Sequence, residues 1–300
     1  MKTVIPHYYR AFRCIASACR HNCCLEGWEI DLDDAHVELY KKLAEEQEKN
    51  GEPSIREGLV LPTVRERRNG NVPHIRLKEN GVCPFLNPEG LCKLILDHGE
   101  KAICQICTDH PRFRNYYKNH MELGVGLCCE EACRIILEDE QMGRYEELAT
   151  GAEAVPMHQK LELKKKALEL SGISLDFRAW AEYLLGLECL EGSWRQLLEK
   201  YLTAGQEQTK AKEEWPAAWD RRFMNLEEYF LYRYGAREGA GFASFSTRLI
   251  RELAQMDQSA DEEELFKQLK EICRLYSSEI EYSEDNRKAV IERLQREQYR

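Results

Sequence analysis

Eleven of the 13 cysteines in this chain lie between residues 14 and 133, and this clustering constrains the fold more than any other feature. Only Cys189 and Cys273 stand in the second half. A chain of 300 residues with 43% apolar content can bury a sizeable core without the help of a metal, so the cysteines need an explanation of their own. We therefore predict two domains, a cysteine-rich metal-binding domain over residues 1–150 and a helical domain over residues 151–300.

The cysteines do not read as a disulfide framework. The N-terminal sequence lacks the apolar run of a secretion signal, and nowhere do about 18 apolar residues follow one another, so we expect a cytoplasmic protein with no membrane partner. Cysteines in a reducing compartment seldom persist as disulfides, and an odd number fits a disulfide framework poorly. The formal net charge of −10 argues against a general nucleic-acid binder. Thiolates that hold a metal explain the cysteines better.

Helical periodicity dominates the pattern outside the cysteine groups. Acidic residues at 31, 33 and 34 predict the start of a helix over residues 33–48, because carboxylates cap free amides and favour the positive helix end. Short helices are expected near 99–107 and 130–140, and β-prone runs at 59–64 and 74–77 predict a small hairpin. Beyond residue 151, apolar residues recur three or four positions apart, and Ser283 is placed to cap a final helix through about Gln298. The expected fold class is mainly α with minor β, in which irregular cysteine-rich loops precede a helical bundle.

The clustered cysteines fall into three groups whose local spacing brings sulfurs together. The groups are Cys14-x4-Cys19-x3-Cys23-Cys24, then Cys83, Cys92 and Cys104-x2-Cys107, and finally Cys128-Cys129-x3-Cys133. A four-iron cluster and a tetrahedral zinc site each take about four ligands, so up to two sites are within reach. Only Cys104-x2-Cys107 has the form of a zinc knuckle, and adjacent pairs such as Cys23-Cys24 suit zinc poorly. Spacing alone therefore leaves both iron–sulfur and zinc open as the metal of these sites.

Other residues near these groups give weaker signals. The histidines His21, His74, His98 and His110 are possible ligands, but a lone histidine is more often an ordinary polar side chain. Cys189 and Cys273 lie inside helical patterns and are expected to pack as small apolar side chains.

Several segments resemble the flagellin lysine-N-methylase family and, more broadly, a CxxCxxCC group of proteins described as zinc- or iron-chelating. The resemblance rests on Cys14-x4-Cys19-x3-Cys23-Cys24-x3-Trp28-x-Ile30-Asp31, Cys83-Pro84-Phe85-Leu86, Gly90-Leu91-Cys92, Gly99-Glu100, Cys104-x2-Cys107-x2-His110-Pro111-Arg112, Cys129-Glu130-Glu131-Ala132 and the Tyr-rich run from Asn225 to Tyr232. It spans most of the chain to about residue 235. His110 stands where the family usually has Tyr, Glu130 replaces Pro, and Cys128 and Cys133 are additional.

The resemblance implies an iron–sulfur-dependent protein lysine N-methyltransferase with a 4Fe-4S cluster, S-adenosylmethionine as methyl donor and flagellin as the expected acceptor. It also implies the metal ligands, which are Cys14, Cys19, Cys23, Cys24, Cys83, Cys92, Cys104, Cys107 and Cys129. Arg112 is the candidate cofactor-binding residue, since a guanidinium can pair with a cofactor carboxylate or offset the charge of a cluster. The alternative is a non-catalytic zinc- or iron–sulfur-binding module that serves interaction or electron transfer.

Standard cofactor motifs do not accompany this resemblance. No glycine-rich turn follows a strand as in a Rossmann-type site, and Gly124-Val125-Gly126 is interpreted as a turn. The Cys-x3-Cys-x2-Cys spacing of radical enzymes begins at Cys19 and at Cys129 but fails at Glu26 and Ile136. The catalytic residues stay unassigned, with weak candidates in Tyr116, Tyr117, Glu130 and Glu131.

Overall fold

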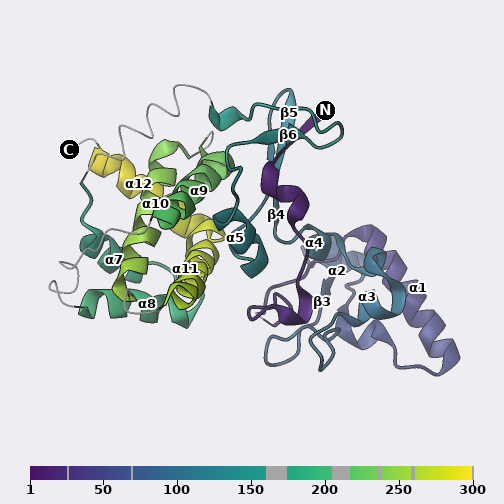
Figure 1. Cartoon of the computed structure of the whole chain (residues 1–300). Coiled ribbons are helices and arrows are strands. Elements are labelled where there is room, and N and C mark those ends of the chain that lie inside the picture. The colour runs from purple at the N-terminus through teal and green to yellow at the C-terminus, as the bar shows by residue number, and fades with distance from the viewer. Residues whose placement is uncertain are drawn as a thin grey trace. The chain divides into compact units, whose positions relative to one another are not determined.

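The chain divides into two compact units in the computed structural model, which describes residues 1–25, 27–68, 70–159, 174–204, 217–235, 238–257 and 261–298. Unit 1 joins Met1–Arg13 to Pro111–Arg300, and unit 2 is the intervening segment Cys14–His110 (Figure 1). The division follows contacts between residues. The predicted domains, 1–150 and 151–300, follow the distribution of the cysteines along the sequence, and they stay a prediction.

Unit 2 is built on helix α1 (Asp34–Asn50). The helix begins where the sequence predicted it, because the Asp33 side chain accepts a hydrogen bond from the backbone N–H of His36. It ends at Gly51, whose φ of 71° lies in the left-handed region that favours glycine. Val37, Tyr40 and Ala44 form its buried face. The predicted helix over 33–48 is confirmed.

Short elements complete unit 2. They are α2 (Val64–Arg68), α3 (Lys93–His98), α4 (Gln105–Asp109), β2 (Leu59–Val60) and β3 (His74–Ile75). The two strands pair antiparallel with Leu59 opposite Ile75, which confirms the predicted hairpin in a shorter form. A small core holds them together, and it includes two cysteines; its buried members are Ile30, Leu32, Val37, Tyr40, Leu59, Ile75, Cys83, Phe85, Leu94, Ala102 and Cys104.

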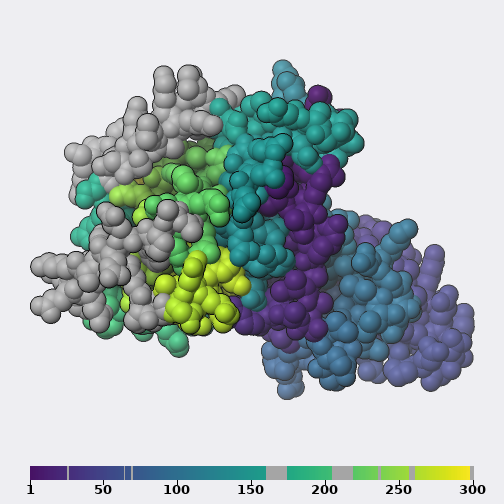
Figure 2. Space-filling model, viewed as in Figure 1, coloured from purple at the N-terminus to yellow at the C-terminus, as the bar shows by residue number. Residues whose placement is uncertain are grey.

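Unit 1 contains a four-stranded sheet with one strand from the N-terminus. The strands are β1 (Lys2–Pro6), β4 (Arg112–Tyr116), β5 (His120–Val125) and β6 (Tyr145–Glu147), in the order β4-β5-β1-β6. β1 runs parallel to β5 and antiparallel to β6, with Thr3 opposite Met121. Figure 2 shows this N-terminal segment, in purple, beside the teal segment that carries β5 and β6.

The interpretation of Gly124-Val125-Gly126 as a turn is wrong. Gly124 and Val125 are the last two residues of strand β5, and Gly124 pairs with Phe113 on β4. A Cβ atom added at Gly124 would lie only 2.4 Å from the Phe113 ring. Glycine is needed here for the close approach of an aromatic ring, and no change of chain direction is involved.

Helices make up most of the other described residues of unit 1 and confirm the mainly α fold class. They are α5 (Glu130–Leu137), α7 (Phe177–Leu185), α8 (Gly192–Thr203), α9 (Ala217–Tyr234), α10 (Ala240–Ala254), α11 (Glu262–Tyr276) and α12 (Glu284–Gln298). Ser283 caps α12 as predicted, since its hydroxyl accepts from the backbone N–H of Asn286 at 3.2 Å. In the part of the chain that the structure describes, no helix is both long and apolar enough to cross a membrane.

Helix α9 holds the end of α5 through a buried amide. The side-chain nitrogen of Asn225, a residue only 2% exposed, donates to the carbonyl oxygens of Ile136, Leu137 and Asp139 at 3.1, 3.1 and 2.8 Å. The last carbonyl groups of a helix have no partner within the helix, so this amide satisfies groups that would otherwise be buried without one.

Replacing this amide should destabilise unit 1. We expect Asn225→Leu to lower the free energy of unfolding by about 2–3 kcal/mol, because buried carbonyl groups lose their donor. Urea denaturation followed by tryptophan fluorescence measures the change, since four of the five tryptophans belong to unit 1. The neighbouring Met224, 61% exposed, provides the control: Met224→Ala should change stability by less than about 0.5 kcal/mol. Equal effects of the two substitutions would contradict the role given to Asn225.

Candidate functional site

The structure places eight of the nine predicted ligands in unit 2. These are Cys14, Cys19, Cys23, Cys24, Cys83, Cys92, Cys104 and Cys107. Cys129 belongs to unit 1, where it immediately precedes α5. Glu26, which breaks the radical-type spacing, lies outside the described residues.

One close pair of thiols stands at the start of α4. The Sγ atoms of Cys104 and Cys107 are 3.6 Å apart, with Cys104 just before the helix and Cys107 one turn along it. The hydrogen bond between the two lowers the pKa of Cys104 to about 7, against the effect of burial. The same hydrogen bond raises the pKa of Cys107. The pair therefore shares a proton, and Cys104 is the more readily ionised sulfur.

A second close pair joins segments that are far apart in the sequence. The backbone N–H of Cys83 donates to the carbonyl oxygen of Cys24 at 2.8 Å, and the two side chains are hydrogen-bonded as well. This side-chain hydrogen bond lowers the pKa of Cys83 to about 7. Hydrogen bonds with Cys23 and Cys83 raise the pKa of Cys24. Cys23 thus belongs with this second pair.

Electrostatic interactions link the two pairs. The charge of Cys104 acts on Cys83, and the charges of Cys23 and Cys83 act on Cys107. Burial raises the pKa of Cys92, and the charges of Cys83 and Cys104 raise it further. We call the resulting set the thiol group; its members are Cys23, Cys24, Cys83, Cys92, Cys104 and Cys107. It draws on three separate stretches of unit 2.

The thiol group is not arranged around a single point. Across the described ranges, no three His, Cys, Asp or Glu side chains converge as the ligands of one metal ion do. The exposed Cys14 lies in the same unit, where its sulfur accepts from the backbone N–H of Ala16 at 3.4 Å. The ligand roles of the nine cysteines, Cys14, Cys19 and Cys129 among them, stay predictions.

Arg112 lies in unit 1 as the first residue of β4. Its Nε donates to the Tyr9 hydroxyl at 3.2 Å, and its guanidinium lies 5.1 Å from the centre of the Phe12 ring. These contacts fix the side chain against the N-terminal segment. Its predicted role toward a cofactor is not tested by them.

The weak catalytic candidates of the sequence have ordinary surroundings. Glu131 forms two hydrogen bonds with Arg134, and Glu130 lies 3.6 Å from the Lys270 ammonium. Tyr116 is 63% exposed, and the Tyr117 ring stacks on His120 at 4.9 Å. Each contact is of a kind that helices and strands make for stability.

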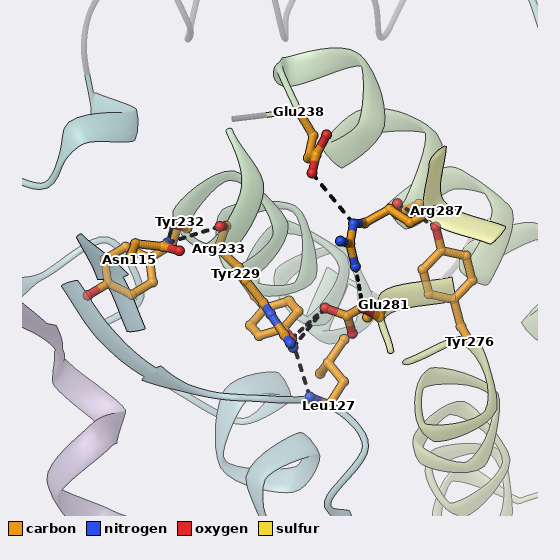
Figure 3. A network of polar contacts seen from close by, with 10 residues as sticks. Asn115, Leu127, Tyr229, Tyr232, Arg233, Glu238, Tyr276, Glu281 and Arg287 are labelled. Carbon is orange, nitrogen blue, oxygen red and sulfur yellow. Dashed lines mark hydrogen bonds and ion pairs between the residues drawn. The ribbon is translucent and has the colours of Figure 1, made fainter. Parts of the chain in front are cut away.

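A buried ion pair at the end of α9 was not expected from the sequence. Arg233 Nη1 lies 3.0 Å from Glu281 Oε1 and 2.7 Å from the Tyr229 hydroxyl, which itself donates to Glu281 at 2.8 Å (Figure 3). The Glu281 side chain is 0% exposed and the Arg233 side chain 10%. The backbone N–H of Leu127, just after β5, donates to the Tyr229 hydroxyl at 3.3 Å. The segment after β5, helix α9 and the Glu281 carboxylate are thus joined through the Tyr229 hydroxyl oxygen.

The carboxylate of this network sits in an unusual turn. Ser277–Glu281 is a π-helical turn between α11 and α12, a local geometry that is frequent at functional sites. Arg287 Nη1 donates to the carbonyl oxygen of Glu281 at 2.6 Å, and Arg287 Nε lies 3.5 Å from Glu238 (Figure 3). A Cβ atom at Gly126 would lie 2.9 Å from Arg233 Nη1, so glycine gives the guanidinium its room.

A cysteine of the third sequence group adjoins the same network. Cys128 is hydrogen-bonded to Tyr282, whose ring lies 5.2 Å from the Arg233 guanidinium. Burial raises the pKa of Cys128 to about 12, which keeps the sulfur protonated at neutral pH. The one sequence signal for this region was the Tyr-rich run from Asn225 to Tyr232, which supplies Tyr229.

A second buried cluster joins β6 to α9. Glu228 Oε1 accepts hydrogen bonds from the Tyr145 hydroxyl at 2.7 Å and from His158 Nε2 at 2.8 Å. The Tyr145 ring stacks on Tyr232 at 5.1 Å. Two donors therefore hold the Glu228 carboxylate beside an aromatic stack in unit 1.

Three known proteins share part of this sequence. Two proteins named Lysine-N-methylase, from Salmonella typhimurium and Salmonella choleraesuis, are 31% and 32% identical to the chain over 135 residues. Each match covers 45% of this chain and 32% of the relative, so the chain spans about a third of the length of these two proteins. The Flagellar biosynthetic protein FliU of Salmonella muenchen is 30% identical over 135 residues, which are 45% of this chain and 76% of FliU. No family model matches the chain, and no solved structure matches it.

Breaking the buried ion pair should be costly. We expect Arg233→Leu to lower the free energy of unfolding by about 3–5 kcal/mol, because it leaves the Glu281 carboxylate unpaired in the interior. Adding Glu281→Leu should recover part of this loss, since neither charge is then left alone. Chemical denaturation measures both variants.

An exposed ion pair serves as the control for this prediction. Lys267 lies 2.9 Å from Glu263, with side chains 42% and 81% exposed, and Lys267→Ala should leave the free energy of unfolding nearly unchanged. If Arg233→Leu cost no more than Lys267→Ala, the network would not be a main support of unit 1.

Proposed function

The chain belongs to the flagellin lysine-N-methylase family, and we propose from this premise that it is a protein lysine N-methyltransferase that acts on flagellin. The observation that carries the proposal is the match to FliU, which covers 76% of that protein at 30% identity. The printed names of the relatives connect lysine methylation with flagellar biosynthesis. We propose S-adenosylmethionine as the methyl donor, as the family resemblance implies.

The proposal includes an iron–sulfur centre held by the thiol group. Six thiols in one unit form a soft donor set, the kind that iron–sulfur clusters and zinc both prefer. A metal ligand must lose its proton, and the lowered pKa of Cys83 and of Cys104 favours the thiolate form of one sulfur in each pair. The donor chemistry of these residues therefore suits such a centre.

Iron–sulfur is preferred to zinc because the family resemblance implies it. We propose that four of the six thiols hold the cluster, with Cys24, Cys83, Cys104 and Cys107 as the leading set. When bound, the cluster would supply a redox-active iron centre.

The chain's own residues would contribute the scaffold of the reaction. Unit 1 presents α9, whose Tyr-rich run is one of the segments on which the resemblance rests and whose Tyr229, Glu228 and Tyr232 are fixed by hydrogen bonds and ring contacts. We propose that this helix orders the methyl-transfer site. A lysine must lose its proton before its nitrogen can attack a methyl group, and a buried carboxylate with tyrosine neighbours is a setting in which such a proton can be held.

Methyl transfer should be directly observable. We expect anaerobically prepared protein to transfer labelled methyl groups from S-adenosylmethionine to a co-purified flagellin, with the label on lysine side chains after digestion and mass spectrometry. Reactions that lack flagellin provide the background. A protein with an intact metal centre that repeatedly gives no labelled flagellin would contradict the proposed activity and favour an electron-transfer or interaction module.

Metal content should depend on the thiol group. We expect Cys104→Ala to lose most of its bound iron, because the variant removes one sulfur from the leading ligand set. Cys189→Ala is the matched control: Cys189 lies in unit 1, where its sulfur contacts the Glu191 carbonyl oxygen at 3.2 Å, and its iron content should be unchanged. Elemental analysis and acid-labile sulfide measure both. Retention of iron in Cys104→Ala would remove Cys104 from the ligand set.

A further inference from the structure

Two buried cysteines of unit 1 are in contact across helices α5 and α11. Cys133 on α5 and Cys273 on α11 are both 0% exposed, and both belong to the large hydrophobic core of this unit. Their side chains are hydrogen-bonded to each other. Both are free thiols in the structure, and neither is a member of the thiol group of unit 2.

Two further contacts fix how the helices lie against each other at this point. The Cys133 thiol donates to the carbonyl oxygen of Lys270 at 3.9 Å, and Lys270 is one turn before Cys273. One turn before Cys133, the Glu130 carboxylate lies 3.6 Å from the Lys270 ammonium. Successive turns of α5 and α11 are therefore in contact. The approach of the two sulfurs is part of a defined packing of two helices.

Buried thiols often serve only as small apolar side chains, which is the role that the sequence predicts for Cys273. Two thiols that touch have a second property. A disulfide needs its two sulfurs on facing segments whose side chains point toward each other, and the Cys133–Cys273 contact meets this condition.

We propose that Cys133 and Cys273 are a disulfide-forming pair, oxidised by a low-molecular-weight disulfide such as oxidised glutathione and reduced again by small thiols. The thiolate of one cysteine attacks the small disulfide, which leaves a mixed disulfide and releases one small thiol. The other cysteine then loses its proton and attacks the mixed disulfide. The protein S–S bond forms and a second small thiol leaves, so the two hydrogen atoms lost by the protein are gained by the small disulfide.

This modification goes beyond the proposed methyl transfer and does not depend on the proposed metal centre. Burial makes the reaction slow, because it raises the pKa of the Cys133 thiol and leaves little of the reactive thiolate. Both sulfurs are reached only when the helices open locally.

The bond would join two helices whose neighbouring segments meet at the buried ion pair. Leu127, which precedes α5, and Glu281, which follows α11, both contact the Tyr229 hydroxyl. A disulfide between these helices closes a long loop of unit 1 and restricts the unfolded chain, an effect that grows with loop length. The oxidised protein should therefore unfold at a higher urea concentration than the reduced protein.

The test uses the whole chain incubated with oxidised glutathione, after which the remaining thiols are alkylated in denaturant. Cleavage after glutamate separates these two cysteines from all others, because Cys133 alone is in residues 132–138 and Cys273 alone is in residues 272–279. Mass spectrometry without reductant should show the two peptides linked, and dithiothreitol should release them. Recovery of both peptides only in alkylated form after exhaustive incubation, or linkage of either one mainly to other cysteines, would overturn the proposal.

Variants assign the bond. Cys273→Ala should lose the linked peptide, whereas the control Cys189→Ala removes the other cysteine of the second half and should keep it. The wild-type result does not depend on how well either variant folds.

Urea denaturation followed by tryptophan fluorescence gives an independent reading. Oxidation should raise the unfolding midpoint of the wild type, and dithiothreitol should reverse the shift. The same treatments should leave the midpoint of Cys273→Ala unchanged. A wild-type midpoint that oxidation leaves unchanged or lowers would also overturn the proposed bond, since a disulfide compatible with the packed helices restricts only the unfolded chain.

Discussion

The hydrogen bond between the Cys24 and Cys83 side chains ties together two segments of unit 2 that are far apart in the sequence. The strands of unit 2 are two residues long, and three of its four α-helices have only five or six residues, so regular hydrogen bonding supplies little of its stability. Cys83 and Cys104 are instead part of its small buried core. The Cys24–Cys83 pair joins two stretches that are far apart in the sequence, whereas Cys104–Cys107 is a local pair at the start of α4. A metal bound by these sulfurs would add its binding free energy to the folding of the unit.

Unit 1 is held together by a different chemistry. Its core is aromatic, and within it Arg233, Tyr229 and Glu281 tie α9 to the turn after α11 and to the end of β5. Burying an ion pair costs desolvation free energy, and only well-formed hydrogen bonds to both charges offset that cost. The side chains of such a network must therefore be placed accurately. The Tyr-rich run, one of the segments on which the family resemblance rests, lies on this helix. The network thus gives that segment a defined packing arrangement, while the proposed metal centre concerns the cysteines of unit 2.

Local features of the chain were predictable, and long-range ones were not. Asp33 and Ser283 correctly predicted the starts of α1 and α12, because capping depends on residues within one turn of the helix. The parallel pairing of β1 with β5 joins residues 2–4 to 120–122, and nothing in a local pattern specifies such a partner. Gly124 was misread because a glycine that makes room for Phe113 looks the same in a sequence as one that turns the chain. The thiol group was foreseen as a collection of cysteines, but the pairing of Cys24 with Cys83, and the contact of Asp33 with the backbone of Gln105, depend on how the loops fold.

X-ray absorption at the iron edge of anaerobically prepared protein tests the central claim most directly. The account predicts a first shell dominated by sulfur, together with scattering from neighbouring iron atoms, because thiolates of unit 2 hold a cluster. A first shell of oxygen and nitrogen with no iron neighbour would contradict it, since that is the pattern of iron bound loosely to surface groups. Tightly bound zinc with sulfur ligands in place of iron would contradict the iron–sulfur assignment and leave the cysteine site itself in place.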